Sequence, residues 1–299
     1  MALDITNKTI LYACLNWGNG HLSRSIGVIR ALLEEGNSVL FAGDEFQQTI
    51  IKEYFPSIQT FDLAAYPFTF TKDSSFTVDL YKSRNVLMKH VRYEYNEVQT
   101  ILKNNPTIDL VLSDHRYGVY STSVPSFFIT HQVKLAVKWY QFPAQYIHNV
   151  LMSPFNKVLI MDDAENRLAG KLSAAPQRKD YQYIGHYSRF DVNQAEKTLE
   201  VGVVNGPLPY SEQLFEALLE KKELDKFVVS EHSYYKSLDS RLVNAVSWKQ
   251  ADEVIVKAQT IHAYCGYSTL MDIKVLGCKG ELKPTPGQLE QEYLFKLNY

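Results

Sequence analysis

The sequence predicts an α/β protein made of two Rossmann-like domains that face each other across a cleft. Short runs of apolar and β-branched residues alternate with longer segments of helical period along almost the whole chain. This alternation is typical of parallel sheets that helices cover on both faces. The pattern breaks after Gly185 and restarts beyond Lys197, which indicates a hinge between two units. With 299 residues, 45% of them apolar, the chain is long enough to bury two cores.

In the first half, each predicted strand is a short apolar run and each predicted helix a longer periodic one. The first helix ends at Gly36 and Asn37, which both tolerate the left-handed conformation. The third helix places Leu87, Val91 and Val98 near one face. In chain order, the predicted elements are strand 10–15, helix 21–35, strand 38–42, helix 45–54, a long helix within 77–103, and strands 109–113, 126–130 and 158–161.

In the second half, the same alternation begins again after a Gly-Pro turn at 206–207. We place the domain boundary so that residues 1–190 form the first domain and residues 191–299 the second. The predicted elements here are strand 201–204, helix 210–221, strand 227–230, strand 261–264, helix 268–276 and a helix from 288 to the end.

Composition excludes several classes of protein. Charges are balanced, with 31 basic and 33 acidic side chains, which speaks against a general nucleic-acid binder. Cys14, Cys265 and Cys278 lie far apart, so neither a disulfide framework nor a zinc site is indicated, and a cytoplasmic location is expected. The sequence shows no secretory signal and no run of about 18 apolar residues. Because no His-x-x-x-His or Asp-x-Asp arrangement occurs, no metal site is predicted.

A glycine-rich turn follows the first strand, in the stretch from Trp17 to His21. Gly18 and Gly20 let backbone amides approach an anion, and the following helix N-terminus adds partial positive charge. Tight packing alone would also explain the glycines. A dinucleotide fingerprint, with Asp44 on the ribose, is a weaker alternative, because His21 would crowd a pyrophosphate.

Polar side chains follow two further strands of the first half. Asp114, His115, Arg116, Tyr117 and Gly118 come after one of them, and His131 with Gln132 after the next. The carboxyl ends of parallel strands share one edge of a sheet, so His21, His115 and His131 are expected to cluster there. One of them could act as a general base. A solvated loop that caps itself is the alternative interpretation.

Two segments of the second half have features of a ligand site. In the first, Gly266 precedes Ser268 and Thr269, which could cap a helix and offer hydroxyls to a phosphate, and Asp272 lies one turn further on. In the second, residues 284–292 carry Gln288, Glu290 and Gln291, which suit hydrogen bonds to sugar hydroxyls. Ordinary capping and dipole effects would explain both segments without a ligand.

A basic stretch in the long helix could face a membrane or an acceptor. Lys82, Arg84, Lys89 and Arg92 lie there, with phenylalanines at 68, 70 and 76 nearby. A solvated helix face is the simpler interpretation.

Six stretches, in this order and spanning nearly the whole chain, resemble GT-B-fold bacterial glycosyltransferases related to the N-acetylglucosaminyltransferase that forms lipid II. They are NWGNGHLSRSIGVIRALLEEGNSVLFAGD, SDHRYGVYS, VPSFFITHQ, YIGHYSRF, GYSTLMD and PTPGQLEQEYL. The resemblance implies transfer of a sugar from a nucleotide sugar, usually UDP-linked, to a glycan or lipid-linked acceptor. It also implies inversion at the anomeric carbon without a metal or other cofactor, by an enzyme that works in the cytoplasm or at the inner face of the membrane.

The resemblance also implies roles for single residues. The first domain would bind the acceptor through Arg116, Tyr117, His131 and Gln132, and His21, Asp114 and His115 are rival candidates for the catalytic base. The second domain would bind the donor. The predicted donor contacts are Gly18, Gly20, Gly266, Ser268, Thr269, Asp272, Gln288, Glu290 and Gln291.

The chain departs from the family pattern at three places. The turn at 206–210 lacks the Gln-Arg expected after its second proline, the strand before Pro284 is charged, and the sequence stops at Tyr299, where relatives continue. These departures keep a second hypothesis open, a sugar-nucleotide-binding protein without transferase activity. A dinucleotide-dependent oxidoreductase is the third.

Overall fold

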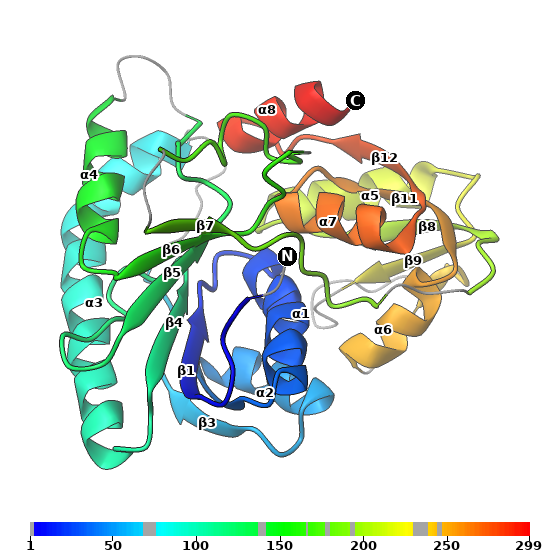
Figure 1. The fold of residues 1–299 in the computed structure, drawn as a ribbon. Helices are drawn as coiled ribbons and strands as arrows, with labels where there is room; N and C mark the ends of the chain where they lie inside the picture. The colour runs from blue at the N-terminus through cyan, green and yellow to red at the C-terminus, as the bar shows by residue number, and fades with distance from the viewer. Residues whose placement is uncertain are drawn as a thin grey trace.

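The computed structural model of the chain describes residues 3–67, 76–136, 142–165, 167–176, 180–191, 195–229, 239–243 and 247–299. These residues form two parallel sheets, each with helices on both faces (Figure 1). The predicted α/β fold class with two Rossmann-like domains is therefore confirmed.

The first sheet has seven parallel strands in the order β3-β2-β1-β4-β5-β6-β7. The helices α1 and α2 cover the face turned toward the second domain, and α3 and α4 cover the opposite face (Figure 1). The elements are β1 (Thr9–Cys14), α1 (Gly20–Glu34), β2 (Ser38–Gly43), α2 (Glu45–Tyr54), β3 (Gln59–Asp62), α3 (Phe76–Asn104), β4 (Leu110–Asp114), β5 (Ser126–Thr130), α4 (Phe142–Met152), β6 (Lys157–Ile160) and β7 (Tyr181–Tyr183).

The second sheet has five parallel strands in the order β10-β9-β8-β11-β12. The predicted boundary at residue 190 falls between the last strand of the first sheet and the first strand of the second. The elements are β8 (Leu199–Val204), α5 (Tyr210–Glu220), β9 (Lys226–Val229), β10 (Leu242–Val243), α6 (Trp248–Ile255), β11 (Ala258–Tyr264), α7 (Tyr267–Leu276), β12 (Lys279–Lys283) and α8 (Leu289–Asn298).

Local chemistry explains where several of these elements begin and end. Gly36 has a φ of 78° just past α1, and the amide of Asn37 closes the helix on the carbonyl of Leu32, as the sequence predicted. Asp44 forms a capping box with Gln47 at the start of α2. That carboxylate, which the dinucleotide hypothesis assigned to a ribose, is therefore engaged in a helix cap.

The two domains share one apolar core. Buried side chains from α1 and the first sheet, among them Ile26 and Ile29, belong to the same cluster as Met271 of α7 and Ile255 of α6. At the end of the chain, α8 also contacts the first domain, where Tyr293 accepts a hydrogen bond from the amide of Lys171. The arrangement of the two sheets is thus held by extensive packing between the domains.

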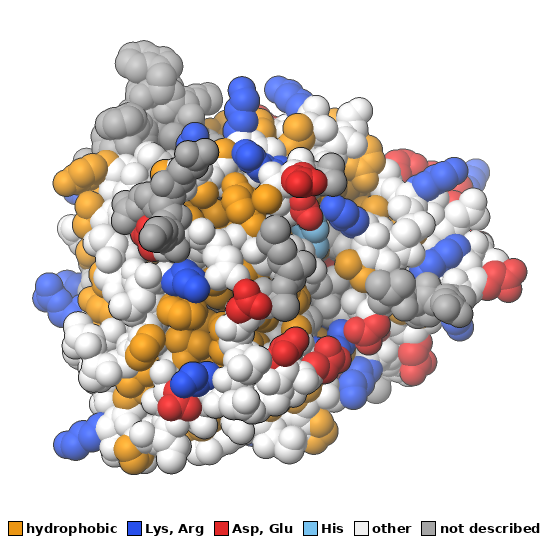
Figure 2. Space-filling model, viewed as in Figure 1, with side chains coloured by type: hydrophobic (Ala, Val, Ile, Leu, Met, Phe, Trp, Pro, Cys, Tyr) orange, Lys and Arg blue, Asp and Glu red, His pale blue; other side chains and the backbone are white. Residues whose placement is uncertain are grey.

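The surface carries both signs of charge. On the face seen in Figure 2, lysine and arginine side chains are interspersed with aspartate and glutamate. Lys82, Arg84, Lys89 and Arg92 of α3 are exposed, and Phe68 and Phe70 lie outside the described residues. Among the described residues, no helix combines the length and the apolar character needed to cross a bilayer.

Candidate functional site

The glycine-rich turn joins β1 to α1 at the boundary between the two domains. Gly18 has a φ of 68°, in the left-handed region that favours glycine. The next glycine, Gly20, opens α1, and its carbonyl oxygen accepts a hydrogen bond of 2.8 Å from the hydroxyl of Ser268. The two predicted phosphate-binding segments therefore lie against each other, one from each domain.

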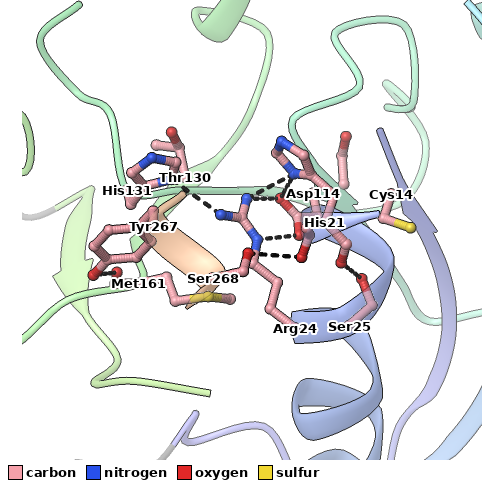
Figure 3. A network of polar contacts seen from close by, with 12 residues as sticks. Cys14, His21, Arg24, Ser25, Asp114, Thr130, His131, Met161, Tyr267 and Ser268 are labelled. Carbon is pink, nitrogen blue, oxygen red and sulfur yellow. Dashed lines mark hydrogen bonds and ion pairs between the residues drawn. The ribbon is translucent and has the colours of Figure 1, made fainter. Parts of the chain in front are cut away.

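Asp114 ends β4 and is completely buried beside the first turn of α1. Its Oδ2 accepts a hydrogen bond of 2.7 Å from Nε of Arg24, and its Oδ1 accepts one from Nη2 of the same side chain. Nδ1 of His21 lies 3.0 Å from Oδ1 of Asp114 and 2.8 Å from Nη2 of Arg24 (Figure 3). His21 and Asp114 were predicted from the sequence as site residues, whereas Arg24 was not.

The surroundings of Asp114 and His21 determine their protonation states. Burial opposes ionisation of Asp114, but the charge of Arg24 and the hydrogen bonds from Arg24 and His21 hold its pKa far below the ordinary value. Burial lowers the pKa of His21, and the neighbouring Arg24 lowers it further. An ionised Asp114 next to a neutral His21 is the result at neutral pH.

His131 connects this group to the second domain. Its Nδ1 lies 3.0 Å from Nη1 of Arg24, and its Nε2 lies 2.7 Å from Oε1 of Glu290 on α8. The ring also stacks on Tyr267 of α7, with 4.1 Å between ring centroids and 3° between planes. The pKa of Glu290 is lowered, because the interaction with His131 outweighs the cost of burial. A predicted acceptor residue thus contacts a predicted donor residue.

His115 lies on the other side of His21, with 5.5 Å between the ring centroids. Its φ of 63° places it in the left-handed region, and its buried Nδ1 has no hydrogen-bond partner. Burial lowers its pKa well below the ordinary value, and the neighbouring His21 and His148 add to this effect. The predicted cluster of three histidines is confirmed: His115 adjoins His21 directly, and His131 joins it through Arg24.

His148 is a second residue of the site that was not predicted from the sequence. It lies on α4, where its Nδ1 is 2.7 Å from the hydroxyl of Tyr117 and its Nε2 donates to the carbonyl of Gln132 at 2.9 Å. Burial lowers its pKa to about 4. The predicted acceptor residues Tyr117 and Gln132 therefore share one partner.

Arg116 does not take the position predicted for it as an acceptor contact. Its side chain is completely buried and pairs with Glu94 of α3, with 2.5 Å between Nε and Oε1. Glu94 also accepts a hydrogen bond of 2.7 Å from the hydroxyl of Tyr66. A buried guanidinium requires such a partner, since an unpaired charge in the interior is very costly. Arg116 reaches no open surface, so its prediction as an acceptor contact is wrong.

The start of α7 differs in part from the prediction. Gly266 is the N-cap and no side chain caps the helix, so the predicted capping by Ser268 and Thr269 is wrong. Ser268 bonds to the first domain instead, and Oγ1 of Thr269 accepts a hydrogen bond of 3.1 Å from Asn205. Neither the hydroxyl of Ser268 nor that of Thr269 therefore caps the N-terminus of α7.

Asp272, one turn into α7, faces the segment that joins the domains. Its Oδ1 accepts a hydrogen bond of 2.5 Å from the hydroxyl of Ser188, and its Oδ2 lies 4.0 Å from Nη1 of Arg189. Burial raises the pKa of Asp272 to about 6, even though Arg189 acts in the opposite direction. A bound ribose would have to share this carboxylate with Ser188.

The glutamines of the last segment organise the turn before α8. The amide of Thr285 donates to Oε1 of Gln291, and Nε2 of Gln291 donates to Oε1 of Gln288, both at 2.8 Å. Gly287, with a φ of 76°, completes the turn. These bonds fix the first turn of α8 and so place Glu290 next to His131.

A cavity of about 370 Å³ opens between the domains beside the glycine-rich turn. Phe46 and Asp44 contribute to its wall, and none of the described residues that line it is a lysine or an arginine. Its described lining combines amide side chains, the carboxylate of Asp44, the hydroxyl of Ser211 and glycine backbone with apolar side chains and the ring of Phe46, which suits the hydroxyls and faces of a sugar. The wall is formed by Asn16, Gly18, Asn19, Leu22, Asp44, Phe46, Gln47, Val204, Gly206, Pro207, Leu208 and Ser211.

In the part of the chain that the structure describes, no set of three or more His, Cys, Asp or Glu side chains is arranged to hold a metal ion.

Comparison with known proteins supports the fold assignment. No protein-family model and no curated protein sequence matches the chain. Among solved structures, the spinosyn rhamnosyltransferase SpnG complexed with thymidine diphosphate aligns with a TM-score of 0.59 and 13% identity, over 97% of this chain and 84% of SpnG. LpCGTa in complex with UDP aligns with a TM-score of 0.59 and 12% identity, over 97% of this chain and 82% of LpCGTa.

The MurG structure of Acinetobacter baumannii aligns with a TM-score of 0.53 and 12% identity, over 97% of this chain and 82% of MurG. The chain has the GT-B fold. In this GT-B chain, both predicted ligand segments lie at the boundary between the domains, and the carboxyl ends of β1, β4 and β5 lead to His21, His115 and His131.

Proposed function

We propose that the chain transfers a sugar from a nucleoside diphosphate sugar to a hydroxyl group of a glycan or lipid-linked acceptor, with His21 as the general base. The observation that carries the proposal is the contact between the neutral His21 and the ionised, buried Asp114. This pair lies next to the part of the cavity wall that Gly18, Asn19 and Leu22 form.

The geometry favours His21 over its two rivals. The carboxylate of Asp114 is fully buried and is occupied by Arg24, so an acceptor hydroxyl cannot approach it. Burial lowers the pKa of His115 well below the ordinary value, so its imidazole is a weak base. In the tautomer that donates Nδ1–H to Asp114, His21 keeps the lone pair of Nε2 for the acceptor.

The reaction then follows from the charges. Nε2 of His21 takes the proton of the acceptor hydroxyl while its oxygen attacks the anomeric carbon of the donor. The bond from that carbon to the phosphate oxygen breaks, the nucleoside diphosphate leaves, and the anomeric configuration inverts. Asp114 stabilises the imidazolium that forms. No step in this scheme requires a metal ion.

The donor site is proposed on the second domain. SpnG is complexed with thymidine diphosphate and LpCGTa with UDP, which supports a nucleoside diphosphate as the leaving group. Backbone amides at the start of α7 and in the turn from Gly18 to Gly20 would stabilise its phosphates. Gly266, Ser268 and Thr269 would contribute there and Asp272 would hold the ribose, with Gln288, Glu290 and Gln291 on the sugar side.

Calorimetric titration with UDP and with thymidine diphosphate tests the donor site. We expect micromolar binding to at least one of them, weakened in Asp272→Ala by about 1–3 kcal/mol, the scale of hydrogen bonds to a charged group. Mass spectrometry of acceptors incubated with UDP-sugars then tests transfer. Nucleotide binding without turnover would support the binding-protein hypothesis, which the absence of a basic side chain in the turn at 206–210 favours. No binding to either nucleotide would contradict both hypotheses.

A further inference from the structure

The guanidinium of Arg24 occupies the centre of the polar network at the domain boundary (Figure 3). Only 1% of the side chain is exposed. Nε and Nη2 hold Asp114, Nη1 points to Nδ1 of His131 at 3.0 Å, and Nη2 also lies 2.8 Å from Nδ1 of His21. Arginine suits this position because its planar fork carries five donors and a permanent charge.

The bonds of His131 determine how this network extends to the second domain. The carboxylate of Glu290 can only accept, so Nε2 of His131 carries the hydrogen in the 2.7 Å contact with Oε1. Nδ1 is then the acceptor for Nη1 of Arg24. The parallel stack on Tyr267 holds the ring in this orientation. An unbroken path of hydrogen bonds therefore runs from Glu290 through His131 and Arg24 to Asp114.

We infer that Arg24 is a positioning residue that couples the His21–Asp114 pair of the first domain to Glu290 of the second domain through His131. The orientation of the pair then depends on the contact between the domains at this point. The consequence for catalysis rests on the proposed role of His21 as base, whereas the coupling itself does not.

The coupling can be measured through the pKa of His21, because charged groups surround its imidazole. The groups that face it are Arg24 on α1, Asp114 and His115 at the end of β4, His131 after β5, and Glu290 on α8. Arg24 disfavours the protonated imidazole, whereas the carboxylates favour it. Removing the guanidinium therefore raises the pKa of His21.

The test is an NMR titration of the full chain, labelled on its histidine and arginine side chains, without donor or acceptor. In Arg24→Met we expect the pKa of His21 to rise by about 1 unit or more relative to the unsubstituted protein. Arg30→Met is the matched control, since Arg30 lies on the same helix and pairs with Asp191 at the surface. An unchanged pKa in Arg24→Met, or an equal rise in Arg30→Met, would overturn the inference.

The link to the second domain is tested with His131→Phe, which keeps a ring on Tyr267 but removes both nitrogens. We expect the guanidinium hydrogens of Arg24 to exchange with solvent about tenfold faster, the scale of losing one hydrogen bond of a charged group, while those of Arg30 do not change. Unchanged exchange at Arg24 would disprove the link through His131.

A third variant covers the case in which Arg24→Met does not fold. Arg24→Lys keeps the charge, but one ammonium group cannot hold Asp114 and His131 together. We expect the ¹⁵N shift of His131 Nδ1 to move toward that of a free imidazole nitrogen, and an unmoved shift would contradict the inference. None of these measurements needs turnover, so a failed transferase assay would count against the proposed function alone.

Discussion

The hydroxyl of Ser268 donates a hydrogen bond to the carbonyl oxygen of Gly20, and this bond joins the first turn of α7 to the first turn of α1. The two helices meet at the point where the donor diphosphate is proposed to bind. About two turns further along α1, Gly27 passes directly against the backbone of Ser188, in the segment that joins the domains. Glycines of α1 therefore set how closely this helix approaches α7 at Gly20 and the segment around Ser188 at Gly27.

We predict that Gly27→Ala destabilises the chain by about 1–3 kcal/mol, because an added Cβ would lie 2.2 Å from the carbonyl oxygen of Ser188. Gly20→Ala is the matched comparison. There the nearest atom is the hydroxyl oxygen of Ser268, at 3.0 Å, and a side chain can rotate away. Urea unfolding of both variants measures the difference. Equal free energies of unfolding for the two variants would show that the backbone at Ser188 can move away from the added Cβ without loss of stability.

Replacing His21 tests the proposed base. His21→Gln removes the only proton acceptor that we assign to the acceptor hydroxyl, so we expect the transfer rate to fall about 10²- to 10⁴-fold. Nucleotide binding should persist, because the proposed donor contacts next to His21 are backbone amides, which the substitution keeps. His262→Gln is the control, since this histidine is buried in the second sheet and bonds to Glu200. A His21→Gln variant with the full rate would exclude His21 from the chemistry.

We predict that Arg116 stabilises the fold and does not contact the acceptor. Arg116→Met leaves Glu94 buried without its charged partner, so we expect a loss of about 3–5 kcal/mol in the free energy of unfolding. In the double variant Glu94→Gln, Arg116→Met, no unpaired charge remains, and part of this loss should be recovered. If Arg116→Met instead kept its stability but lost acceptor affinity, the original interpretation as an acceptor contact would be restored.

Much of the fold could be predicted from the sequence, because apolar runs and helical periods report burial directly. The helix at Glu45–Tyr54 was predicted with its observed bounds. Most of the elements that were missed have weak patterns. The strand Gln59–Asp62 has no buried residue, and β10 is two residues long. The helix Phe142–Met152 lacks a clear apolar period, so His148 was missed with it. The helix Trp248–Ile255 was missed too, although Trp248, Ala251 and Ile255 form a clear buried stripe.

Residues of the site could be predicted only where the order of strands along the chain determines where those residues lie in the fold. Parallel strands bring their carboxyl ends to one edge, so His21, His115 and His131 could be grouped in advance. The partners of charged side chains that lie far apart in the sequence cannot be predicted from the order of the strands. Arg24 and Arg116 both stand near histidines in the sequence, yet the fold turns one toward the site and the other toward Glu94. The i, i+3 spacing of His21 and Arg24 was the one local signal for Arg24.

Asp272 should make stability depend on pH. Its pKa is raised to about 6 in the folded chain, so the folded state binds the proton more tightly than the unfolded state. The stabilisation from this proton is complete below about pH 4 and is lost as the pH rises toward 6. Asp272→Asn resembles the protonated form. We expect it to exceed the unsubstituted protein in stability by about 2–3 kcal/mol at pH 8 and to match it near pH 4. Denaturant titrations at both pH values measure this, and a pH-independent difference would contradict the assignment.

The pH dependence of transfer should report His21. A base must be unprotonated, and burial together with Arg24 lowers the pKa of His21, so kcat/KM should stay level at neutral pH and fall only below about 6.5. Asp114 acts in the opposite direction, since its charge and its hydrogen bond favour the imidazolium.

Asp114→Asn should therefore move the acidic limb to lower pH while it reduces the maximal rate, because the amide no longer stabilises the protonated base. Initial rates between pH 5 and 8 (about the range in which histidine titrates) separate the two effects. A limb that moved to higher pH in Asp114→Asn would show that a group other than His21 titrates.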